Sequence, residues 1–341
     1  MRTSERTIPD VVGDVYETIR REFVSDNPQV SGILGRVFST PGKGARPLFM
    51  EMIARRNGGG WESVRKAATA VEAVHIASLL HDDVVDGSKM RRGKTTLHTR
   101  YSDKISILFG DYVFMKAIMI ADSIGNPDAV QVIHDAVRRM IEGEIRDSLS
   151  IGPLESGSPD YRHPKLCNAQ LGDPSKHNPG CLEDAYYSII GDKTASLFAA
   201  AGEAGIILSG GGPRERSLAR DLGEAVGMAF QIIDDTLDFQ GDAALMGKPA
   251  FMDLCGGFPT LPVIHALHGY DSDEVKRMLV GDTGSADSLL AVVRERGGIE
   301  YARERARGFI QKGREILEYF GDGDSDDEFG RFFEMIVGRR A

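Results

Sequence analysis

Long runs of apolar residues at helical spacing dominate the sequence. In these runs the apolar side chains recur every three or four positions, which is the period of one face of an α-helix. We expect helices over residues 64–80, 106–124, 129–151, 181–208 and 217–239, separated by the breakers GNP (125–127), SGGGPRE (209–215) and GDTGSAD (281–287). Alternating segments with turn signals, which would indicate a sheet, are missing from the sequence. The pattern therefore predicts an all-α bundle of long helices around a central space.

Two segments interrupt this pattern. Residues 152–180 are rich in glycine, proline, serine and asparagine and predict a long inserted loop. Its His163, Cys167 and His177, with the adjoining Cys181, do not have the spacing of a zinc site. Residues 321–328, GDGDSDDE, predict an acidic solvated segment before a short terminal helix, FGRFFEMIVGRR. The sequence has no internal repeat of solenoid period. We expect residues 1–341 to form a single all-α domain with one inserted loop.

Composition and charge argue against several classes of function. Hydrophobic residues make up 41% of the chain and charged residues 27%, as in globular proteins, and the net charge of −10 disfavours general binding of nucleic acid or anionic membranes. No apolar run approaches the roughly 20 residues of a membrane span, and MRTSERTIPD at the N-terminus lacks the apolar stretch of a signal peptide. The three cysteines make no disulfide framework. We expect a cytoplasmic protein that binds anions through local basic clusters.

An acidic pattern, D-D-x-x-D, occurs twice, each time after an apolar helical run. The two copies are Asp82, Asp83 and Asp86, and Asp234, Asp235 and Asp238. On a helix the first and last aspartates of each copy lie on one face, and such like charges are costly unless a cation lies between them. Mg²⁺ prefers one or two carboxylates together with phosphate oxygens and water. The two motifs therefore predict magnesium sites that bind a diphosphate between them.

Other interpretations of the first motif fit less well. An EF-hand would place Val84 at the third position of the loop and Gly93 at the position of the terminal glutamate. A P-loop needs four residues between its first glycine and GKT, but five separate Gly87 from GKT (93–95), and a helix precedes them in place of a strand. Two solvated, charged helix ends remain the plain structural alternative to metal sites.

Basic residues accompany the acidic motifs. They are Arg91 and Arg92 after the first motif, Lys43 and Arg46 in GKGARP (42–47), Lys193 in GDKTASLF (191–198) and Lys248 in MGKP (246–249). Guanidinium groups bind diphosphate bidentately. A single interior lysine usually extends its amine to solvent, and His75 alone is typical of a core histidine. Their occurrence beside two acidic motifs favours phosphate binding.

These motifs together resemble the all-trans isoprenyl (polyprenyl) diphosphate synthases. The resemblance covers about residues 30 to 335 and rests on GKGARP, VEAVHIASLLHDDVVDGSKMRRG, LFGDYVF, GDKTASLF, GMAFQIIDDTLDF, GK (247–248) and GFPTLPVIHAL. It implies the isoprenoid synthase type of helical bundle with a central substrate cavity. It also implies Mg²⁺-dependent head-to-tail condensation of isopentenyl diphosphate with an allylic diphosphate, carried out by a homodimer.

The resemblance also implies a role for each motif residue. Asp82 and Asp86 would bind two Mg²⁺ ions with Asp83 in support, and a third ion would bind Asp234, aided by Asp235 and Asp238. The allylic diphosphate would be held by these ions and by Arg91, Lys193 and Lys248. The diphosphate of isopentenyl diphosphate would bind Lys43, Arg46, His75 and Arg92. The reacting centre would be lined by Thr194 and Gln231.

In this family, bulk on the helix before the first motif limits the length of the product. Ala77 and Ser78 lie five and four residues before Asp82 and are small, whereas short-chain members carry an aromatic residue at one of these positions. The motif also lacks the two-residue insertion of one geranylgeranyl type. Candidates for a deeper floor are Phe114, Met115, Ile118 and Met119. The resemblance therefore implies a medium-to-long product, in the range from geranylgeranyl to octaprenyl.

One departure and several alternatives remain. Phe258 stands where many members have a lysine before TLP, so one diphosphate contact is missing. Alternatives are a geranylgeranyl or farnesyl diphosphate synthase, the non-catalytic subunit of a heteromeric synthase, a class I terpene cyclase and an acidic helical scaffold. A cyclase usually has a different second metal motif, and non-catalytic subunits lose aspartates or arginines. All six aspartates and both arginines are present here, which favours a catalytic synthase.

Overall fold

The computed structural model describes residues 8–149, 179–239, 259–268, 283–320 and 326–338. Within these ranges the chain is almost entirely helical, and its only strands are β1 (Met90–Arg91) and β2 (Lys94–Thr95). The predicted all-α class is therefore confirmed. None of the helices in the described ranges has both the length and the apolar character needed to cross a membrane. The predictions for Lys248, for Phe258 and for the inserted loop up to residue 178 lie outside the described residues.

The chain divides into two compact units. Unit 1 comprises Met1–Arg138, Leu197–Gly223 and Glu315–Phe329, and unit 2 comprises Arg139–Ser196, Glu224–Arg314 and Gly330–Ala341. Each unit contains one of the two acidic motifs. The candidate functional residues can therefore be placed within their own unit.

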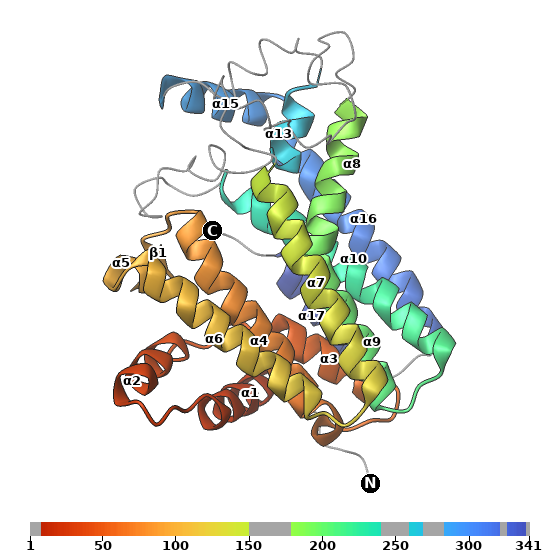
Figure 1. Ribbon diagram of the computed structural model, residues 1–341. Coiled ribbons are helices and arrows are strands. Elements are labelled where there is room, and N and C mark those ends of the chain that lie inside the picture. Colours follow the sequence, from red (N-terminus) through yellow and green to blue (C-terminus); the bar gives the residue numbers. More distant parts are fainter. Residues whose placement is uncertain (1–7, 150–178, 240–258, 269–282, 321–325, 339–341) are drawn as a thin grey trace, which may run out of the picture. The chain divides into compact units, whose positions relative to one another are not determined.

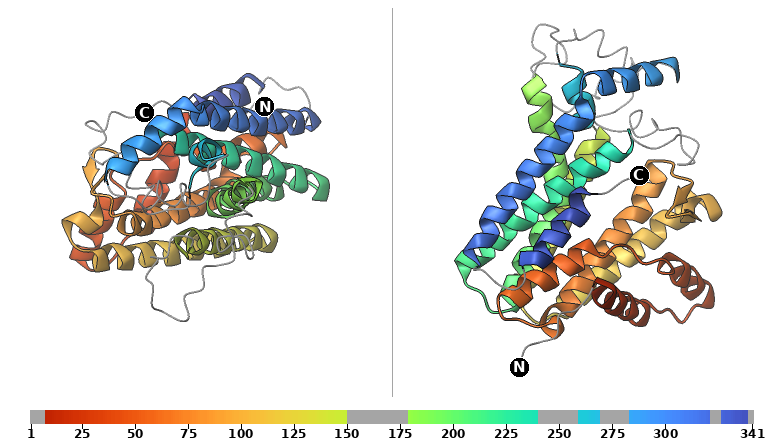
Figure 2. Two further views of the ribbon diagram at one scale, coloured as in Figure 1. Left: turned by 90° about the horizontal axis from the view of Figure 1, so that it is seen from above. Right: turned by 180° about the vertical axis from the view of Figure 1, so that it is seen from behind.

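Unit 1 is built around a central buried helix, α4 (Trp61–Val85). Its neighbours are α1 (Ile8–Glu22), α3 (Ala45–Arg56), α5 (Leu97–Arg100) and α6 (Asp103–Asp122), and α4 lies side by side with α6 (Figures 1 and 2). The unit also contains α2 (Pro28–Val37), most of α9 (Ser196–Leu208), and the first parts of α7 (Pro127–Leu149) and α10 (Pro213–Leu237). Small side chains on several faces of α4 allow this packing, and the fully buried alanines are Ala67, Ala68, Ala70, Ala73 and Ala77.

The C-terminal end of α4 is set by a glycine. Gly87 has a φ of 61°, and its N–H donates to the Val84 carbonyl while the Ser88 N–H donates to the Asp83 carbonyl. This Schellman arrangement satisfies the last carbonyls of the helix and turns the chain away from its axis. The β1–β2 hairpin follows immediately, with Arg91 opposite Lys94. The hairpin that contains the arginine pair therefore follows the first acidic motif directly in the sequence.

Unit 2 contains the second motif and a separate apolar cluster. Its elements are α8 (Pro179–Ile190), the π-helix η2 (Gly191–Ala195), α13 (Leu261–Ala266), α15 (Thr283–Glu295), most of α16 (Gly298–Tyr319), the end of α17 (Asp326–Val337) and the remaining parts of α7 and α10. Helix α13 contacts both α8 and α15 (Figure 1). The cluster comprises Phe239, Val263, Ala266, Leu267, Leu289, Val293 and Ile299. The rings of Tyr187 and Phe309 join α8 to α16, with their centroids 5.8 Å apart.

Most of the predicted helices are confirmed to within a few residues, but three predictions need correction. The helix predicted over 181–208 is interrupted by η2, for the tertiary reason given below. The predicted breaker at 281–287 is wrong from Thr283 onward, where α15 begins, because glycine, serine and threonine are also common at helix starts. The predicted acidic segment is wrong from Asp326 onward, where α17 begins, since acidic residues favour the first turn of a helix.

Candidate functional site

The first acidic motif occupies the last turn of α4 in unit 1. Asp82 is half-buried, Asp83 is only 4% exposed, and Asp86, the C-cap residue, is exposed. The last turn of a helix is the negative end of its dipole, so three carboxylates there are unfavourable without a nearby cation. One cation is present, because Arg91 Nε donates to Asp83 Oδ1 over 2.6 Å. Asp83 therefore faces the protein, whereas Asp82 and Asp86 lie on the more exposed side of the helix.

Asp82 and Asp86 fit a hard divalent cation. They offer carboxylate oxygens one helical turn apart, with access to water. In the described ranges, no three His, Cys, Asp or Glu side chains converge closely enough to hold a metal ion by themselves. Mg²⁺ typically binds in such places, because it takes one or two carboxylates and leaves its other positions to water and substrate phosphate. The donor set is thus suited to an ion that arrives with a phosphate ligand.

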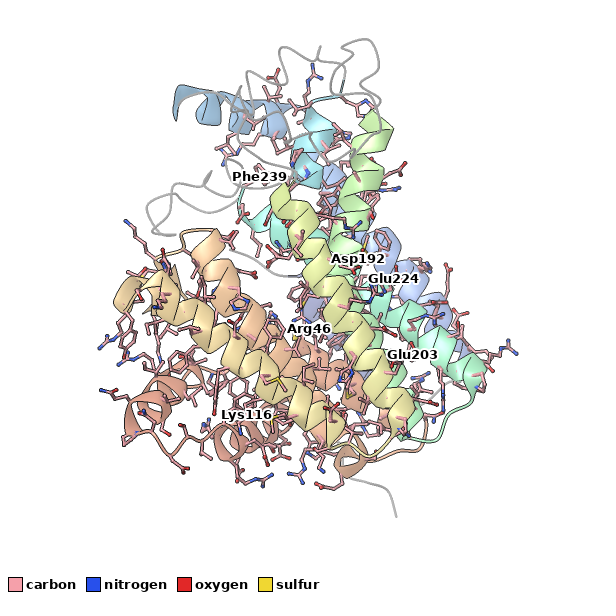
Figure 3. All side chains as sticks on the ribbon, viewed as in Figure 1. Arg46, Lys116, Asp192, Glu203, Glu224 and Phe239 are labelled. Carbon is pink, nitrogen blue, oxygen red and sulfur yellow. The ribbon has the colours of Figure 1, made fainter. Side chains whose placement is uncertain are left out.

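The GKGARP segment leads into α3 of unit 1. Gly44 caps this helix with a φ of 60°, a conformation that strongly favours glycine. The exposed Lys43 precedes it, and the buried Arg46 follows in the first turn (Figure 3). The Arg46 guanidinium lies 4.6 Å from the ring centroid of the buried Phe198, which is a cation–π contact. Arg46 is therefore a buried cation in contact with an aromatic ring.

His75 lies two turns before Asp82 on α4 and is half-buried. Burial, together with the positive charges of Arg46, Arg92 and Arg91, lowers its pKa well below the ordinary value for histidine. At neutral pH the imidazole is uncharged and has one N–H to donate. The predicted anion-binding residues thus form a cationic environment in unit 1 to which His75 adds a hydrogen-bond donor without a charge.

A buried glutamate and tyrosine in the same region were missed by sequence reasoning. Tyr16 Oη donates to Glu72 Oε1 over 3.2 Å and accepts from the Gly42 N–H over 2.8 Å. Burial raises the pKa of Glu72, while the positive charges of Arg46 and Arg92 and the Tyr16 hydrogen bond oppose this shift. Burial and the nearby Glu72 raise the pKa of Tyr16 to about 12. The one available signal was a lone glutamate inside the apolar run ATAVEAVHIA.

The second acidic motif lies at the C-terminal end of α10 in unit 2. Asp234 and Asp238 are half-buried and Asp235 is 9% exposed. Asp235 Oδ2 accepts from Tyr186 Oη over 2.6 Å, and its Oδ1 accepts from Gln231 Nε2 over 2.8 Å. Burial raises the pKa of Asp235 to about 8, although these two hydrogen bonds oppose the shift. Both oxygens of Asp235 therefore accept hydrogen bonds from protein groups. The sequence pattern alone indicates a carboxylate that faces a metal ion.

The π-helix η2 contains Lys193 and Thr194, two further residues of the predicted substrate site. Lys193 Nζ lies 2.8 Å from Glu144 Oε2 and 2.8 Å from Asp147 Oδ2 on α7. Thr194 Oγ1 donates to Gln231 Oε1 over 2.7 Å. A π-turn adds one residue to the helical turn and so changes the direction of the side chains that follow, which is why π-turns often occur at functional sites. Lys193 and Thr194 are both held by groups within unit 2.

Two features hold η2 against α7. A Cβ at Gly143 would lie 2.5 Å from the Lys193 backbone nitrogen, so only glycine allows this approach. Asp192 accepts from Arg139 Nε over 2.8 Å at Oδ1 and is ion-paired with Arg146 at Oδ2 (Figure 3). The two arginines lie two turns apart on α7 and so bind Asp192 from the same side. Sequence reasoning missed all four residues, because the contacts join segments about 50 positions apart.

The predicted chain-length residues on α4 lie N-terminal to the first acidic motif, within about one turn of it. Ala77 is fully buried. Ser78 is half-buried, and its hydroxyl donates to the backbone carbonyl of His75 over 2.9 Å. Because Ser78 precedes Asp82 by one turn, it lies on the same face of α4 as that aspartate. Both side chains are small, so α4 adds little bulk at this level.

The predicted chain-length residues on α6 do not share one environment. Phe114 is half-buried, with its ring centroid 5.6 Å from that of His81, and Ile118 is also half-buried. Met115 and Met119 are 57% and 54% exposed. These two methionines therefore lie on the more exposed face of α6, whereas Phe114 and Ile118 are less exposed. The role of all four side chains as a deeper floor for the product stays a prediction.

Comparison with known proteins identifies the family. The sequence model described as Polyprenyl synthetase matches residues 27–295. The octaprenyl diphosphate synthase of Escherichia coli (strain K12) is 31% identical over 326 residues, which is 94% of this chain and 93% of that protein. The short chain isoprenyl diphosphate synthase of Methanothermobacter thermautotrophicus is 30% identical over 304 residues, 87% of this chain and 86% of that protein.

A solved structure agrees with these relatives. The polyprenyl synthase from Caulobacter crescentus CB15, complexed with calcium and isoprenyl diphosphate, has a TM-score of 0.81 and 28% identity, and the match covers 100% of both chains. The family match spans far more than half of the chain and includes both acidic motifs and the arginine pair. The chain therefore belongs to the polyprenyl synthetase family.

Proposed function

We propose that the chain is a trans-polyprenyl diphosphate synthase that condenses isopentenyl diphosphate head to tail with an allylic diphosphate. The observation that carries this proposal is the repeated D-D-x-x-D motif at the negative ends of α4 and α10, where carboxylates need divalent cations to be stable together. Membership in a family of prenyltransferases supports it. The cytoplasm, where such substrates are soluble, is the proposed location.

Mg²⁺ is the proposed cofactor, with three ions per active site. Asp82, Asp86 and Asp234 are the proposed direct ligands, with the half-buried Asp238 assisting Asp234. All four are more accessible than Asp83 and Asp235. Bound magnesium would supply Lewis-acid stabilisation of the diphosphate leaving group. Asp83 and Asp235 have a supporting role, since Arg91 engages the first and Tyr186 and Gln231 engage the second.

The basic residues bind the two substrates. Arg91, Lys193 and Lys248 hold the allylic diphosphate, and Lys193 is kept in place by Glu144 and Asp147. The second diphosphate is bound by Lys43, Arg46, His75 and Arg92. In this second group the neutral His75 donates one hydrogen bond, and the guanidinium groups supply charge and bidentate contacts. The division gives each substrate its own set of cations.

The reaction forms one carbon–carbon bond and breaks one carbon–oxygen bond. As the allylic C–O bond breaks, the electron pair leaves with pyrophosphate, and the double bond of isopentenyl diphosphate attacks the allylic carbon. A proton is then lost from the new chain to the departing pyrophosphate. Thr194 donates a hydrogen bond to Gln231 Oε1, so its oxygen lone pairs stay available to the developing cation. Water must be excluded, because it would capture the cation.

We favour a medium-to-long product. Ala77 and Ser78 are small, so growing chains can pass the level of the first motif on α4. The octaprenyl relative supports this length, whereas the relative named as a short-chain synthase keeps a geranylgeranyl or farnesyl product as the second candidate. The half-buried Phe114 and Ile118 on α6 are the side chains most suited to limit growth.

A homodimer is the proposed assembly. Leu108, Met115 and Met119 are all at least half exposed and recur on one face of α6, at spacings of seven and four residues. A continuous apolar helix face of this kind favours contact with another protein surface, and a second copy would cover it with the same face of its own α6. Met115→Glu should therefore shift the molar mass measured by light scattering from that of a dimer to that of a monomer.

Product analysis tests the function. Purified protein, Mg²⁺ and labelled isopentenyl diphosphate are incubated with dimethylallyl, geranyl, farnesyl or geranylgeranyl diphosphate, and the products are separated by chromatography. We expect elongation to a defined length beyond farnesyl, and its loss on addition of EDTA. A product that stops at farnesyl would establish a short-chain synthase, whereas geranylgeranyl is the lower end of the expected range. Folded protein that elongates no primer would instead indicate a non-catalytic subunit.

A further inference from the structure

Helix α1 supplies a buried polar contact that the mechanism above does not use. Tyr16 is 1% exposed and Glu72 is 2% exposed, yet their side chains are hydrogen-bonded to each other. A carboxylate in such a position is costly unless charges and hydrogen bonds compensate it. The positive charges of Arg46 and Arg92 act on Glu72 and provide that compensation. Glu72 thus balances two of the cations assigned to the second diphosphate.

The Gly42 backbone lies at the centre of these groups. Its N–H donates to Tyr16 Oη, and a Cβ at this position would lie 2.8 Å from Arg92 Nη2 and 3.2 Å from Glu72 Oε1. Arg92 Nη1 also donates to the Thr40 carbonyl over 3.4 Å. Gly42, Glu72 and the Arg92 guanidinium therefore meet in one place, and the tyrosine hydroxyl joins two of them.

A second contact brings α1 against the same segment. A Cβ at Gly44 would lie 2.5 Å from Val12 Cγ2, so the backbone at the start of α3 packs closely on α1. Val12 and Tyr16 are one turn apart on α1 and both face residues 42–44. Since the family match begins at residue 27, this support comes from a helix outside the matched region.

We propose that Tyr16 and Glu72 are positioning residues that hold residues 40–46 and Arg92 in the conformation that receives the second diphosphate. Neither touches the substrate. Tyr16 holds the loop through the Gly42 N–H, and Glu72 balances the positive charges of Arg46 and Arg92 and lies beside the Arg92 guanidinium. This inference rests on the proposed function for the identity of the anion. It predicts that a change in α1 alters the binding of isopentenyl diphosphate and leaves the allylic substrate unaffected.

The test uses Tyr16→Phe, which removes one hydroxyl and keeps the buried ring. Steady-state kinetics give KM for each substrate and kcat, and calorimetry without metal gives the affinity for inorganic pyrophosphate. We expect KM for isopentenyl diphosphate to rise about threefold to tenfold, as for loss of one hydrogen bond, with KM for the allylic diphosphate unchanged. Tyr112→Phe is the matched control, since the half-buried Tyr112 of the same unit donates to the Val24 carbonyl over 3.4 Å and lies outside this cluster.

Gly42→Ala tests the same arrangement if the tyrosine variant does not fold. Its methyl group displaces the Arg92 guanidinium directly, so the same selective rise in KM is expected. An unchanged KM for isopentenyl diphosphate in both variants, with an active wild-type enzyme, would overturn the inference and leave the proposed function intact. A parallel rise in both KM values would also overturn it, because it would indicate a general loss of structure.

Pyrophosphate binding separates this inference from the proposed function. If wild-type protein elongates no primer, weaker pyrophosphate binding by Tyr16→Phe than by wild type still supports the positioning role. Equal affinities, or no pyrophosphate binding by wild type, would overturn it. Each result therefore decides about Tyr16 independently of product formation.

Discussion

Each unit contains a buried tyrosine that donates to a buried carboxylate, and the two pairs differ in their surroundings. In unit 1 Tyr16 donates to Glu72 over 3.2 Å, and in unit 2 Tyr186 donates to Asp235 over 2.6 Å. Burial raises the pKa of both carboxyl groups. The two pairs thus begin from the same physical problem, which is a carboxylate removed from water.

The neighbouring charges have opposite signs. Glu72 lies among cations, which stabilise its charged form. Asp235 has Asp234 and Asp238 beside it, and their charges raise its pKa further, to about 8. Glu72 is therefore suited to balance charge, whereas Asp235 at neutral pH is suited to organise hydrogen bonds as a protonated group. Similar pairs can serve different purposes when the surrounding charge differs.

The largest expected effect tests whether both acidic motifs are needed. Asp82→Ala and Asp234→Ala should each lower kcat at least about a hundredfold, because each removes a proposed ligand of the ions that stabilise the leaving group. The control is Asp128→Ala, which removes only an exposed ion pair with Arg216. A full rate in either motif variant, measured by incorporation of labelled isopentenyl diphosphate, would exclude that motif from catalysis.

Replacing Glu72 and Asp235 by their neutral amides should affect stability to different extents. Glu72→Gln should reduce the free energy of unfolding by about 3 kcal/mol, because Arg46 and Arg92 then lose their buried counter-charge. Asp235→Asn should cost less, about 1 kcal/mol at neutral pH, since it keeps a neutral group and loses one of the two hydrogen bonds that Asp235 accepts. Urea denaturation at pH 7 without metal measures both values. Equal losses would refute the difference drawn between the pairs.

The glycine at the α7–η2 contact should be sensitive to one methyl group. Gly143→Ala places a Cβ 2.5 Å from the Lys193 nitrogen and should destabilise the protein by about 1–3 kcal/mol while misplacing Lys193 and Thr194. Gly308→Ala is the matched control in unit 2, because its Cβ meets no atom within 4 Å on helix α16. That control should stabilise the protein by up to about 1 kcal/mol. Comparable stability of both variants would argue against a tight contact.

The smallest expected effect concerns pH. His75 has a pKa well below the ordinary value, so below about pH 6.5 the unfolded chain gains a proton that the folded chain does not. Stability should therefore fall as pH decreases from 7 to 5, and less steeply in His75→Gln. His265 of unit 2 has its pKa lowered by burial and by His268, so His265→Gln should change the slope in the same direction but less. Denaturation at several pH values gives both slopes, and identical slopes in wild type and His75→Gln would contradict the assignment.

Local patterns predicted the helices well, and long-range contacts account for what was missed. The apolar period of α4, α6, α7 and α10 is visible within each segment, so those helices were predicted to within a few residues. The π-helix depends on Gly143 and Asp192 meeting from separate helices, which no local period records. Likewise, Tyr16 and Glu72 are separated by 56 positions.

In the acidic motifs, too, the local pattern predicted the residues but not which of them are buried. The repeated pattern identified all six aspartates as candidate metal ligands, because spacing treats the members of a motif alike. Burial distinguishes them, since Asp83 faces Arg91 and Asp235 faces Tyr186 and Gln231. Such assignments depend on which side of the helix is covered, and this is decided by residues distant in sequence.

The β1–β2 turn has a consequence for protein engineering. Arg92 has a φ of 49° and Gly93 a φ of 73°, which match a type I′ turn, where asparagine or glycine is preferred at the first position. An arginine there destabilises the hairpin by roughly 1 kcal/mol relative to glycine. Arg92→Gly or Arg92→Asn would relieve this strain but would also remove a positive charge that stabilises the buried Glu72, together with a guanidinium group that the proposed activity requires. The strained backbone of this turn therefore accompanies a side chain that both the fold and the proposed activity need.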